Sequence, residues 1–309
     1  MMSLALLFPG QGSQHVGMGR ELARELPEAA RVFQEGDDVL GTSLSRLMWE
    51  GPDEELTLTR NAQPAILVHS VAVHTVLRER LGNAALAAGH SMGEFSAHVA
   101  AGTLSFRDTL VAVRLRGELM FEAGIKRPGT MAAVLGLSDS AMQKVCAGVT
   151  DGICVPANFN ADGHVVISGD RAGVQAGIAR AREAGARRVL ELKVSGAFHS
   201  PLMKLAEERF GAHLRGIPFA DPNFPVVSNV TAAPVRIGSQ ARELLVRQLT
   251  APVLWSASVA AMVAAGTDRF LELGPGNVLF GLNKRNARGA SCASVGSPAD
   301  VAQLDRAAS

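Results

Sequence analysis

Cysteine is scarce in this chain of 309 residues, and its three cysteines, Cys146, Cys154 and Cys292, show no C-x-x-C spacing. This pattern disfavours a disulfide framework and a zinc site, and it fits a reducing compartment. Charge of one sign is not in excess either, because 30 Lys and Arg stand against 29 Asp and Glu, for a net charge of +1. Without a basic or acidic block we expect neither nucleic acid nor a membrane surface as a partner.

Long apolar runs are also missing. No stretch approaches the roughly 18 apolar residues that span a bilayer, although 47% of the residues are hydrophobic. The opening MMSLALLFPGQG has no basic segment and its apolar run ends at Pro9, so we interpret it as a first strand and not as a secretory signal. We therefore expect a soluble, cytoplasmic protein with a large core, which binds a small molecule or a protein through a local patch.

Hydrophobic patterns divide the chain into two α/β parts. A strand at 4–8, a helix at 63–81, a strand at 84–88 and helices at 93–101 and 106–123 indicate one α/β unit. Residues 130–194 then follow the order β-α-β-β-α-β, which is the ferredoxin-like pattern. After it come a strand at 224–230, helices at 240–249 and 256–265, and a strand at 269–274. We predict a small domain of 128–195 inserted into a large domain of 1–127 and 196–309, with a ligand cleft between them.

The stretch Gly89-His90-Ser91-Met92-Gly93 fits the G-x-S-x-G nucleophile elbow between the predicted strand and helix. In such an elbow the serine sits on a strained turn at a helix N-terminus, where the helix dipole favours developing negative charge. The backbone N–H of Met92 would then donate to an oxyanion. The competing interpretation is a polar residue in a structural, glycine-rich loop.

A second glycine-rich turn, FPGQGSQ at 8–14, also follows a strand. It lacks the lysine of a Walker loop, and His15 stands where a dinucleotide fingerprint has its third glycine. It is either a backbone donor loop, with the N–H of Gln11 as a second oxyanion donor, or a tight turn without a ligand.

A serine nucleophile needs a base, and we identify His199 as the candidate. It follows a predicted strand, in a loop of small residues, and comes after the serine in chain order, as elbow enzymes require. Arg116 is the candidate for anion binding, because its neighbours at helical spacing are apolar and a buried guanidinium must meet an anion. That anion is either an internal Asp or Glu or a substrate carboxylate.

Several stretches, in this order, resemble the malonyl-CoA:acyl carrier protein transacylase family over essentially the whole chain. They are FPGQGSQ, QPA, GHSMGEFSA, RGELM, NFNADGHVVISG, AFHS and ELGPGNVL. The resemblance implies an α/β-hydrolase-like large domain with an inserted ferredoxin-like one. It also implies that a malonyl group passes from malonyl-CoA to Ser91, with His199 as the base, and then to the phosphopantetheine thiol of an acyl carrier protein.

Further roles follow from the same resemblance. Arg116 would hold the free carboxylate of malonate, with Gln63 near that pocket and Phe198 narrowing the space beside the α-carbon, which favours malonyl over methylmalonyl. Family members orient the histidine with a backbone carbonyl, which maps onto Ala251 before Pro252, where relatives often have Asn-Pro. We expect no cofactor, no metal and a monomer, with fatty acid synthesis as the pathway.

Alternatives differ in class. An α/β-hydrolase-type thioesterase would need an acid between the serine and the histidine, and Asp139, Asp151, Asp162 and Asp170 all fall in the predicted insertion. An acyltransferase of a polyketide synthase, or a subunit of a malonate-decarboxylating complex, would share the chemistry. A non-catalytic binding relative would be expected to have lost a catalytic side chain. Asn158 and Asn160 are candidates for shaping the cleft, and the basic residues Lys284, Arg285 and Arg288 for meeting an acidic carrier protein.

Overall fold

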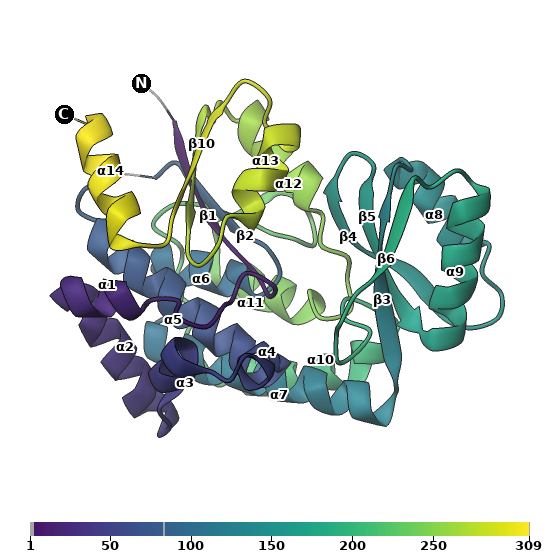
Figure 1. The fold of residues 1–309 in the computed structure, drawn as a ribbon, viewed down its shortest axis with the longest axis horizontal. Coiled ribbons are helices and arrows are strands. Elements are labelled where there is room, and N and C mark those ends of the chain that lie inside the picture. Colours follow the sequence, from purple (N-terminus) through teal and green to yellow (C-terminus); the bar gives the residue numbers. More distant parts are fainter. Residues whose placement is uncertain (1–2, 83, 309) are drawn as a thin grey trace.

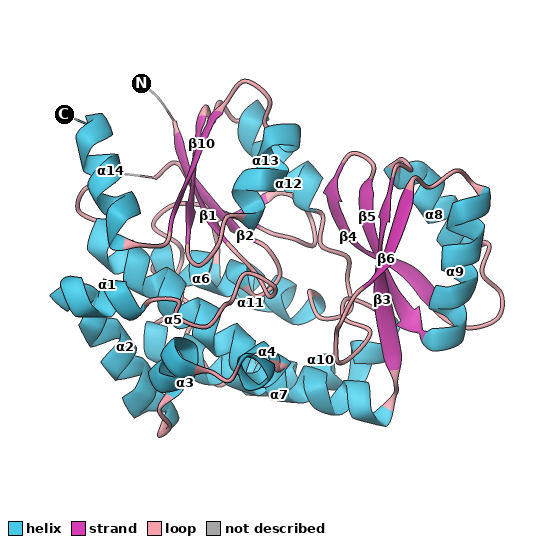
Figure 2. Cartoon of the chain, in the orientation of Figure 1, coloured by secondary structure: helices cyan, strands magenta, loops and turns pink. Residues whose placement is uncertain are grey.

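The structure is a computed structural model that describes residues 3–82 and 84–308. Two β-sheets lie in separate regions of the molecule, with helices around the first and on one side of the second (Figures 1 and 2). The first sheet has the order β10-β9-β1-β2-β7-β8. Its strands are β1 (Leu4–Phe8), β2 (Leu86–Gly89), β7 (Val226–Val227), β8 (Pro234–Val235), β9 (Arg269–Leu273) and β10 (Ser291–Val295). All pairings are parallel except that between β7 and β8.

The central strand β1 explains why this sheet is covered on both faces. All five of its residues are buried, and alternate side chains point to opposite faces. Leu4, Leu6 and Phe8 join the large core, whereas Ala5 and Leu7 join a smaller core beneath the other face. A strand buried on both sides reads as continuous apolar sequence, which is why LALLF shows no polar alternation.

Helices α1–α7, α10 and α11–α14 belong to this first region. Their bounds are α1 Arg20–Glu25, α2 Pro27–Leu40, α3 Leu44–Glu50, α4 Asp53–Thr57, α5 Thr59–Leu77, α6 Gly93–Ala100, α7 Phe106–Lys126, α10 Lys204–Leu214, α11 Gly238–Arg247, α12 Trp255–Ala264, α13 Val278–Asn286 and α14 Pro298–Ala308, with a short 3-10 turn at Pro201–Met203. None of the helices in the described part of the chain is both long and apolar enough to cross a membrane.

Helix α5 begins four residues earlier than the pattern at 63–81 predicts, and Pro64 therefore lies inside it. Proline has no N–H, so the carbonyl of Arg60, one turn earlier, loses its helical donor. The guanidinium of Arg114 on α7 donates to that carbonyl at 2.7 Å and replaces the missing bond. The proline is thus accommodated by the helix that packs against α5, which no local pattern reveals.

The second sheet has the antiparallel order β4-β5-β3-β6. Its elements follow the predicted order, as β3 (Gly129–Leu135), α8 (Asp139–Ala147), β4 (Cys154–Ala161), β5 (His164–Asp170), α9 (Arg171–Glu183) and β6 (Arg188–Glu191). A separate apolar core joins the two helices to this sheet. Backbone bonds from Phe159 N–H to the carbonyl of Val253 (2.9 Å), and from Val253 N–H to the carbonyl of Ala157 (2.8 Å), connect β4 to the loop after α11.

Two strands in the C-terminal third differ from what the sequence predicts. The strand predicted at 224–230 is only Val226–Val227, because Asn229 leaves the sheet and forms hydrogen bonds with the serine turn. Strand β10 was not predicted, since the alternating small residues of SCASV carry little hydrophobic signal.

Candidate active site

The turn that carries Ser91 has the backbone geometry of a nucleophile elbow. It connects the end of β2 at Gly89 with the start of α6 at Gly93, and Ser91 has a φ of 51°. A Cβ on Gly89 would lie 1.9 Å from the backbone of Gly93, and one on Gly93 would lie 2.1 Å from the carbonyl of Phe8. Both glycines are therefore required, because the backbone approaches each of them too closely for a side chain. The positive φ of Ser91 is itself costly for a serine, so the turn is strained.

Asn229 holds this strained turn in place. Its side-chain oxygen accepts the N–H of Ser91 at 2.7 Å, and its side-chain nitrogen donates to the carbonyl of Gly89 at 2.7 Å. The sequence offered no signal for this residue, because its role depends on a contact across 138 positions.

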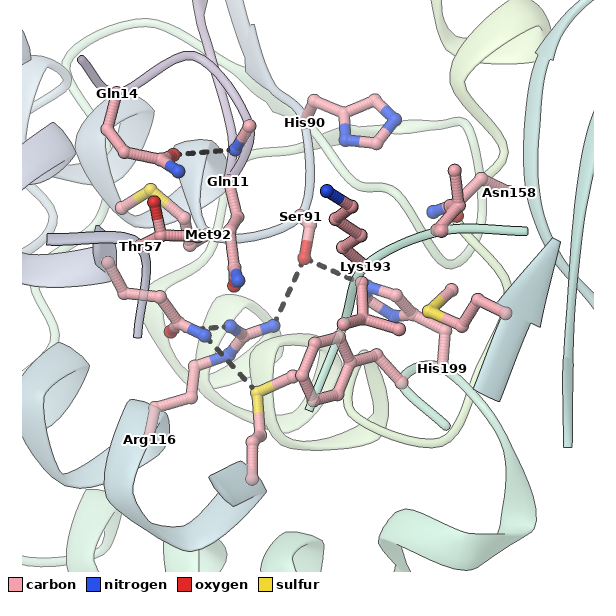
Figure 3. Close-up of a pocket in the computed structure, with 17 residues that line it drawn as sticks. Gln11, Gln14, Thr57, His90, Ser91, Met92, Arg116, Asn158, Lys193 and His199 are labelled. Carbon is pink, nitrogen blue, oxygen red and sulfur yellow. Dashed lines mark hydrogen bonds between the residues drawn. The ribbon is translucent and has the colours of Figure 1, made fainter. Parts of the chain in front are cut away.

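Ser91 and His199 form a hydrogen-bonded pair, with Oγ and Nε2 2.8 Å apart (Figure 3). The other ring nitrogen, Nδ1, lies 2.8 Å from the carbonyl oxygen of Gln248. Because a carbonyl only accepts, we assign the proton to Nδ1, which leaves Nε2 free to accept the serine hydroxyl proton. This is the arrangement that activates a serine for nucleophilic attack.

The carbonyl that orients His199 is not that of Ala251, as predicted, but that of Gln248. Gln248 follows the last residue of α11, where backbone carbonyls have no partner within the helix. The carbonyl of Ala251 also raises the pKa of His199, but less than the carbonyl of Gln248 does. The correction moves the contact three residues toward the helix and gives Gln248 two roles, because its side chain also enters the site.

Arg116 on α7 is fully buried and points at the serine. It donates to Gln63 Oε1 at 2.7 Å, to Gln248 Oε1 at 2.9 Å and, more weakly, to Ser91 Oγ at 3.3 Å. Among the described residues no carboxylate lies within 4.0 Å of its guanidinium. A direct ion pair between Arg116 and an internal Asp or Glu, one of the two alternatives from the sequence, is therefore not formed among the described residues.

Ser91, His199 and Arg116 line one cavity of about 370 Å³. It also brings together the other predicted site residues apart from Ala251, namely Gln11, Gln63, Met92 and Phe198. Asn158 lines the cavity as well, whereas Asn160 Oδ1 lies 2.8 Å from His90 Nε2 and accepts a hydrogen bond from it. Lys284, Arg285 and Arg288 do not line it.

Gln11 and Met92 both line this cavity, and neither backbone N–H has a hydrogen-bond acceptor among the described residues. The loop of Gln11 is held from both sides. Gly12 N–H donates to Gln14 Oε1 at 2.7 Å, and Gln11 Nε2 donates to the hydroxyl of Thr59 at 3.2 Å. Preorganised donors of this kind can stabilise an oxyanion formed at the serine.

Burial and charge set the protonation of the site. Desolvation, followed by the positive charge of Arg116, lowers the pKa of His199 to about 3, so the ring is neutral at physiological pH and able to accept a proton. Burial lowers the pKa of Arg116 to about 10, which leaves it cationic. An anion bound at Arg116 would offset its field and raise the pKa of His199 toward the range of an effective base. Within residues 3–82 and 84–308 no group of three or more His, Cys, Asp or Glu side chains is arranged to hold a metal ion.

Together, the serine elbow and the neutral histidine hydrogen-bonded to it form a site suited to serine-dependent acyl transfer on an α/β frame. A family model described as "Acyl transferase domain" matches residues 5–303. The chain therefore belongs to the acyl transferase domain family, and the protein is an acyltransferase.

Curated relatives cover almost the whole chain. The malonyl CoA-acyl carrier protein transacylase of Bacillus subtilis (strain 168) is 45% identical over 303 residues, which are 97% of this chain and 96% of that protein. The protein of the same name from Escherichia coli (strain K12) is 42% identical over 304 residues, 98% of each chain.

Solved structures of proteins with related names are also similar to this chain over almost its whole length. A malonyl-CoA:acyl carrier protein transacylase from Xanthomonas oryzae pv. oryzae superposes with a TM-score of 0.95 at 41% identity, covering 99% of this chain and 98% of that one. A malonyl-transacylase solved in complex with a type II PKS acyl-carrier protein has a TM-score of 0.94 at 41% identity, covering 98% and 99%.

Proposed function

We propose that the protein transfers the malonyl group of malonyl-CoA to the phosphopantetheine thiol of an acyl carrier protein, through a malonyl-serine intermediate. The observation that carries this proposal is the buried Arg116, which lies in the same cavity as the Ser91–His199 pair and has no directly bonded carboxylate among the residues that the structure describes. A forked cation at this position fits an acyl group that ends in a carboxylate. The names of the relatives point to the same substrate.

In the first half-reaction Ser91 Oγ attacks the thioester carbonyl while its proton passes to His199 Nε2, 2.8 Å away. The carbonyl oxygen becomes negative and accepts from the N–H groups of Gln11 and Met92. When the C–S bond breaks, His199 returns the proton to the sulfur, so that coenzyme A leaves as a thiol. The second half-reaction reverses these steps, with the carrier thiol as the nucleophile.

The Gln248 carbonyl keeps the ring of His199 in the tautomer that both steps need. No acid is required in this scheme, because the carbonyl takes the place that an aspartate holds in a triad. Asp139 and Asp170, two of the acids that a thioesterase might have used, instead lie at the helix starts of α8 and α9.

We further propose the finer architecture predicted above. The sheet order β4-β5-β3-β6, with its own core, supports a ferredoxin-like domain of 128–195 inserted into an α/β-hydrolase-like domain of 1–127 and 196–309. A cytoplasmic monomer remains our expectation. Lys284, Arg285 and Arg288 are all exposed and are proposed to meet an acidic carrier protein.

The test is intact mass spectrometry after incubation with malonyl-CoA or acetyl-CoA. We expect one malonyl adduct on the wild-type protein, little acetyl adduct, and no adduct on Ser91→Ala. Transfer of the adduct to holo carrier proteins of fatty acid and polyketide synthesis then identifies the pathway. Release of coenzyme A without any adduct would contradict the proposal and indicate a hydrolase.

A further inference from the structure

Glu94 is a buried carboxyl group that the reaction scheme above does not use. It is the second residue of α6, three positions after the serine, and only 1% of it is exposed. Its Oε2 accepts the side-chain N–H of Gln248 at 2.6 Å and the backbone N–H of Asn229 at 3.1 Å. The side chain of Ser228 also acts on this carboxyl group and lowers its pKa.

The amide of Gln248 connects Glu94 to the anion-binding arginine. Its nitrogen donates to Glu94, and its oxygen accepts from Arg116 at 2.9 Å. The two charges are therefore separated by one amide group and do not touch. Gln248 also donates to the carbonyl of Ser91 at 3.0 Å, so the bridge passes directly behind the nucleophile.

Glu94 and Arg116 offset each other's charge in the empty site. Burying either charge alone would be expensive, and the charge of Glu94 partly counteracts the effect of burial, which lowers the pKa of Arg116. The compensation is incomplete, since burial raises the pKa of Glu94 to about 7 in spite of the hydrogen bonds and the nearby guanidinium. Glu94 thus changes its protonation readily near neutral pH.

We propose that Glu94 is the counter-charge of Arg116 in the empty site, and that it takes up a proton when the carboxylate of a malonyl group binds to Arg116. This proposal rests on the proposed function. The bound carboxylate would add a second negative charge beside the buried guanidinium of Arg116, in a cavity whose other lining cation, Lys193, is exposed. Because the substrate contacts the guanidinium directly and Glu94 does so only through Gln248, Glu94 is the acid that is neutralised.

Other titratable groups lie nearby. His98, one turn along α6, is fully buried, and His199 lines the cavity with His90 and is close enough to Arg116 for that charge to lower its pKa. Burial holds the pKa of each near 3, so neither carries a proton in the empty site at neutral pH. His199 is the competing acceptor, since a carboxylate at Arg116 would raise its pKa.

Proton balance makes the proposal measurable. Acylation moves the serine proton to the sulfur of coenzyme A, and this thiol stays mostly protonated below its usual pKa of about 8.5. The chemistry itself therefore consumes no proton at pH 6.0–7.5 and releases at most about 0.1 proton per adduct, at the upper end of this range. Any uptake from solution belongs to the protein.

The experiment mixes stoichiometric malonyl-CoA with the enzyme in weakly buffered solution containing an indicator dye, while mass spectrometry counts the adduct. For a group that titrates near pH 7, we expect uptake to rise from about 0.1 proton per adduct at pH 6.0 to about 0.75 at pH 7.5. Glu94→Gln should abolish the uptake. Glu118→Gln, which changes a half-exposed acid paired with Arg114, should leave it unchanged.

The outcomes separate the possibilities. Full adduct without uptake, or equal uptake in Glu94→Gln, overturns the role of Glu94. Proton uptake that falls as the pH rises would also overturn the role of Glu94, because that pH dependence is expected if His199 takes up the proton. This pH dependence is measured on the wild-type protein alone, so it tests the proposal even if Glu94→Gln does not fold. A wild-type protein that forms no malonyl adduct contradicts the proposed function instead.

Discussion

Replacing Arg116 should separate malonyl transfer from acyl transfer in general. Each hydrogen bond between a guanidinium and a carboxylate contributes about 1.5–3 kcal/mol, and the fork can make two. In the empty site the same N–H groups already bond to Gln63 and Gln248, so part of this free energy is lost again when the substrate displaces or shares those contacts. We therefore expect Arg116→Ala to reduce the stabilisation of the transition state for malonyl-CoA by about 3–4 kcal/mol.

That free energy corresponds to a fall of about 10²–10³ in kcat/KM for malonyl-CoA, at about 1.4 kcal/mol per tenfold. Acetyl-CoA has no carboxylate, so its kcat/KM should change by less than about fivefold, with a contribution from the 3.3 Å contact between Arg116 and Ser91. Initial rates of coenzyme A release with both substrates test this.

Two further variants make the result specific. Arg116→Lys keeps the charge without the planar fork, and its rate should lie between those of the wild type and Arg116→Ala. Arg107→Ala removes an exposed cation from the same helix outside the cavity, and it should change kcat/KM for either substrate by no more than about twofold. If Arg116→Ala slows malonyl-CoA and acetyl-CoA equally, the assignment of Arg116 to the substrate carboxylate is wrong.

Two other predictions follow from buried side chains. Phe198 lines the cavity and is 6% exposed, so Phe198→Ala should raise the preference for methylmalonyl-CoA relative to malonyl-CoA by about tenfold or more, as one methyl group excluded by shape contributes about 1–3 kcal/mol. Competition between the two CoA esters, read by adduct mass, would show an unchanged ratio if this is wrong. His98 is buried with neither ring nitrogen hydrogen-bonded among the described residues, and burial lowers its pKa to about 3. Because the unfolded chain protonates this histidine near pH 6.5 and the folded protein does not, its stabilising contribution is lost as the pH falls. Denaturant titrations between pH 6 and pH 4 should therefore show a shallower dependence for His98→Leu, by about 1.4 kcal/mol per pH unit. An unchanged slope would contradict it.

Local sequence predicted the elbow well. Strand β1 has the bounds expected from its apolar run, and the glycines on either side of Ser91 are required by contacts of 1.9 and 2.1 Å. The start of α9 is also marked locally, because the side chain of Asp170 caps this helix by accepting the N–H of Gly173.

The partners of the site residues could not be predicted in the same way. Asn229 and Gln248 are polar residues in segments whose local pattern indicates only the end of a strand and the end of a helix. Neither residue belongs to a recognisable sequence motif, because the side-chain amides of both and the backbone carbonyl of Gln248 meet their partners only through the packing of segments far apart in the chain. The assignment of the orienting carbonyl to Ala251 was wrong for this reason, because a backbone group leaves no trace in side-chain identity.

The amino-acid sequence by itself determined the backbone of the serine turn, the two runs of α/β elements and the apolar setting of Arg116, because steric limits on backbone angles and the periodicity of burial act over a few residues. Only the tertiary structure decided which groups meet. It brings His199 across 108 positions to Ser91, and it places Gln248 between Glu94 and Arg116, so that these two charged groups are bridged by an amide and not paired directly. Such pairings depend on how whole helices and sheets pack, and long-range electrostatics and hydrogen bonding follow from that packing.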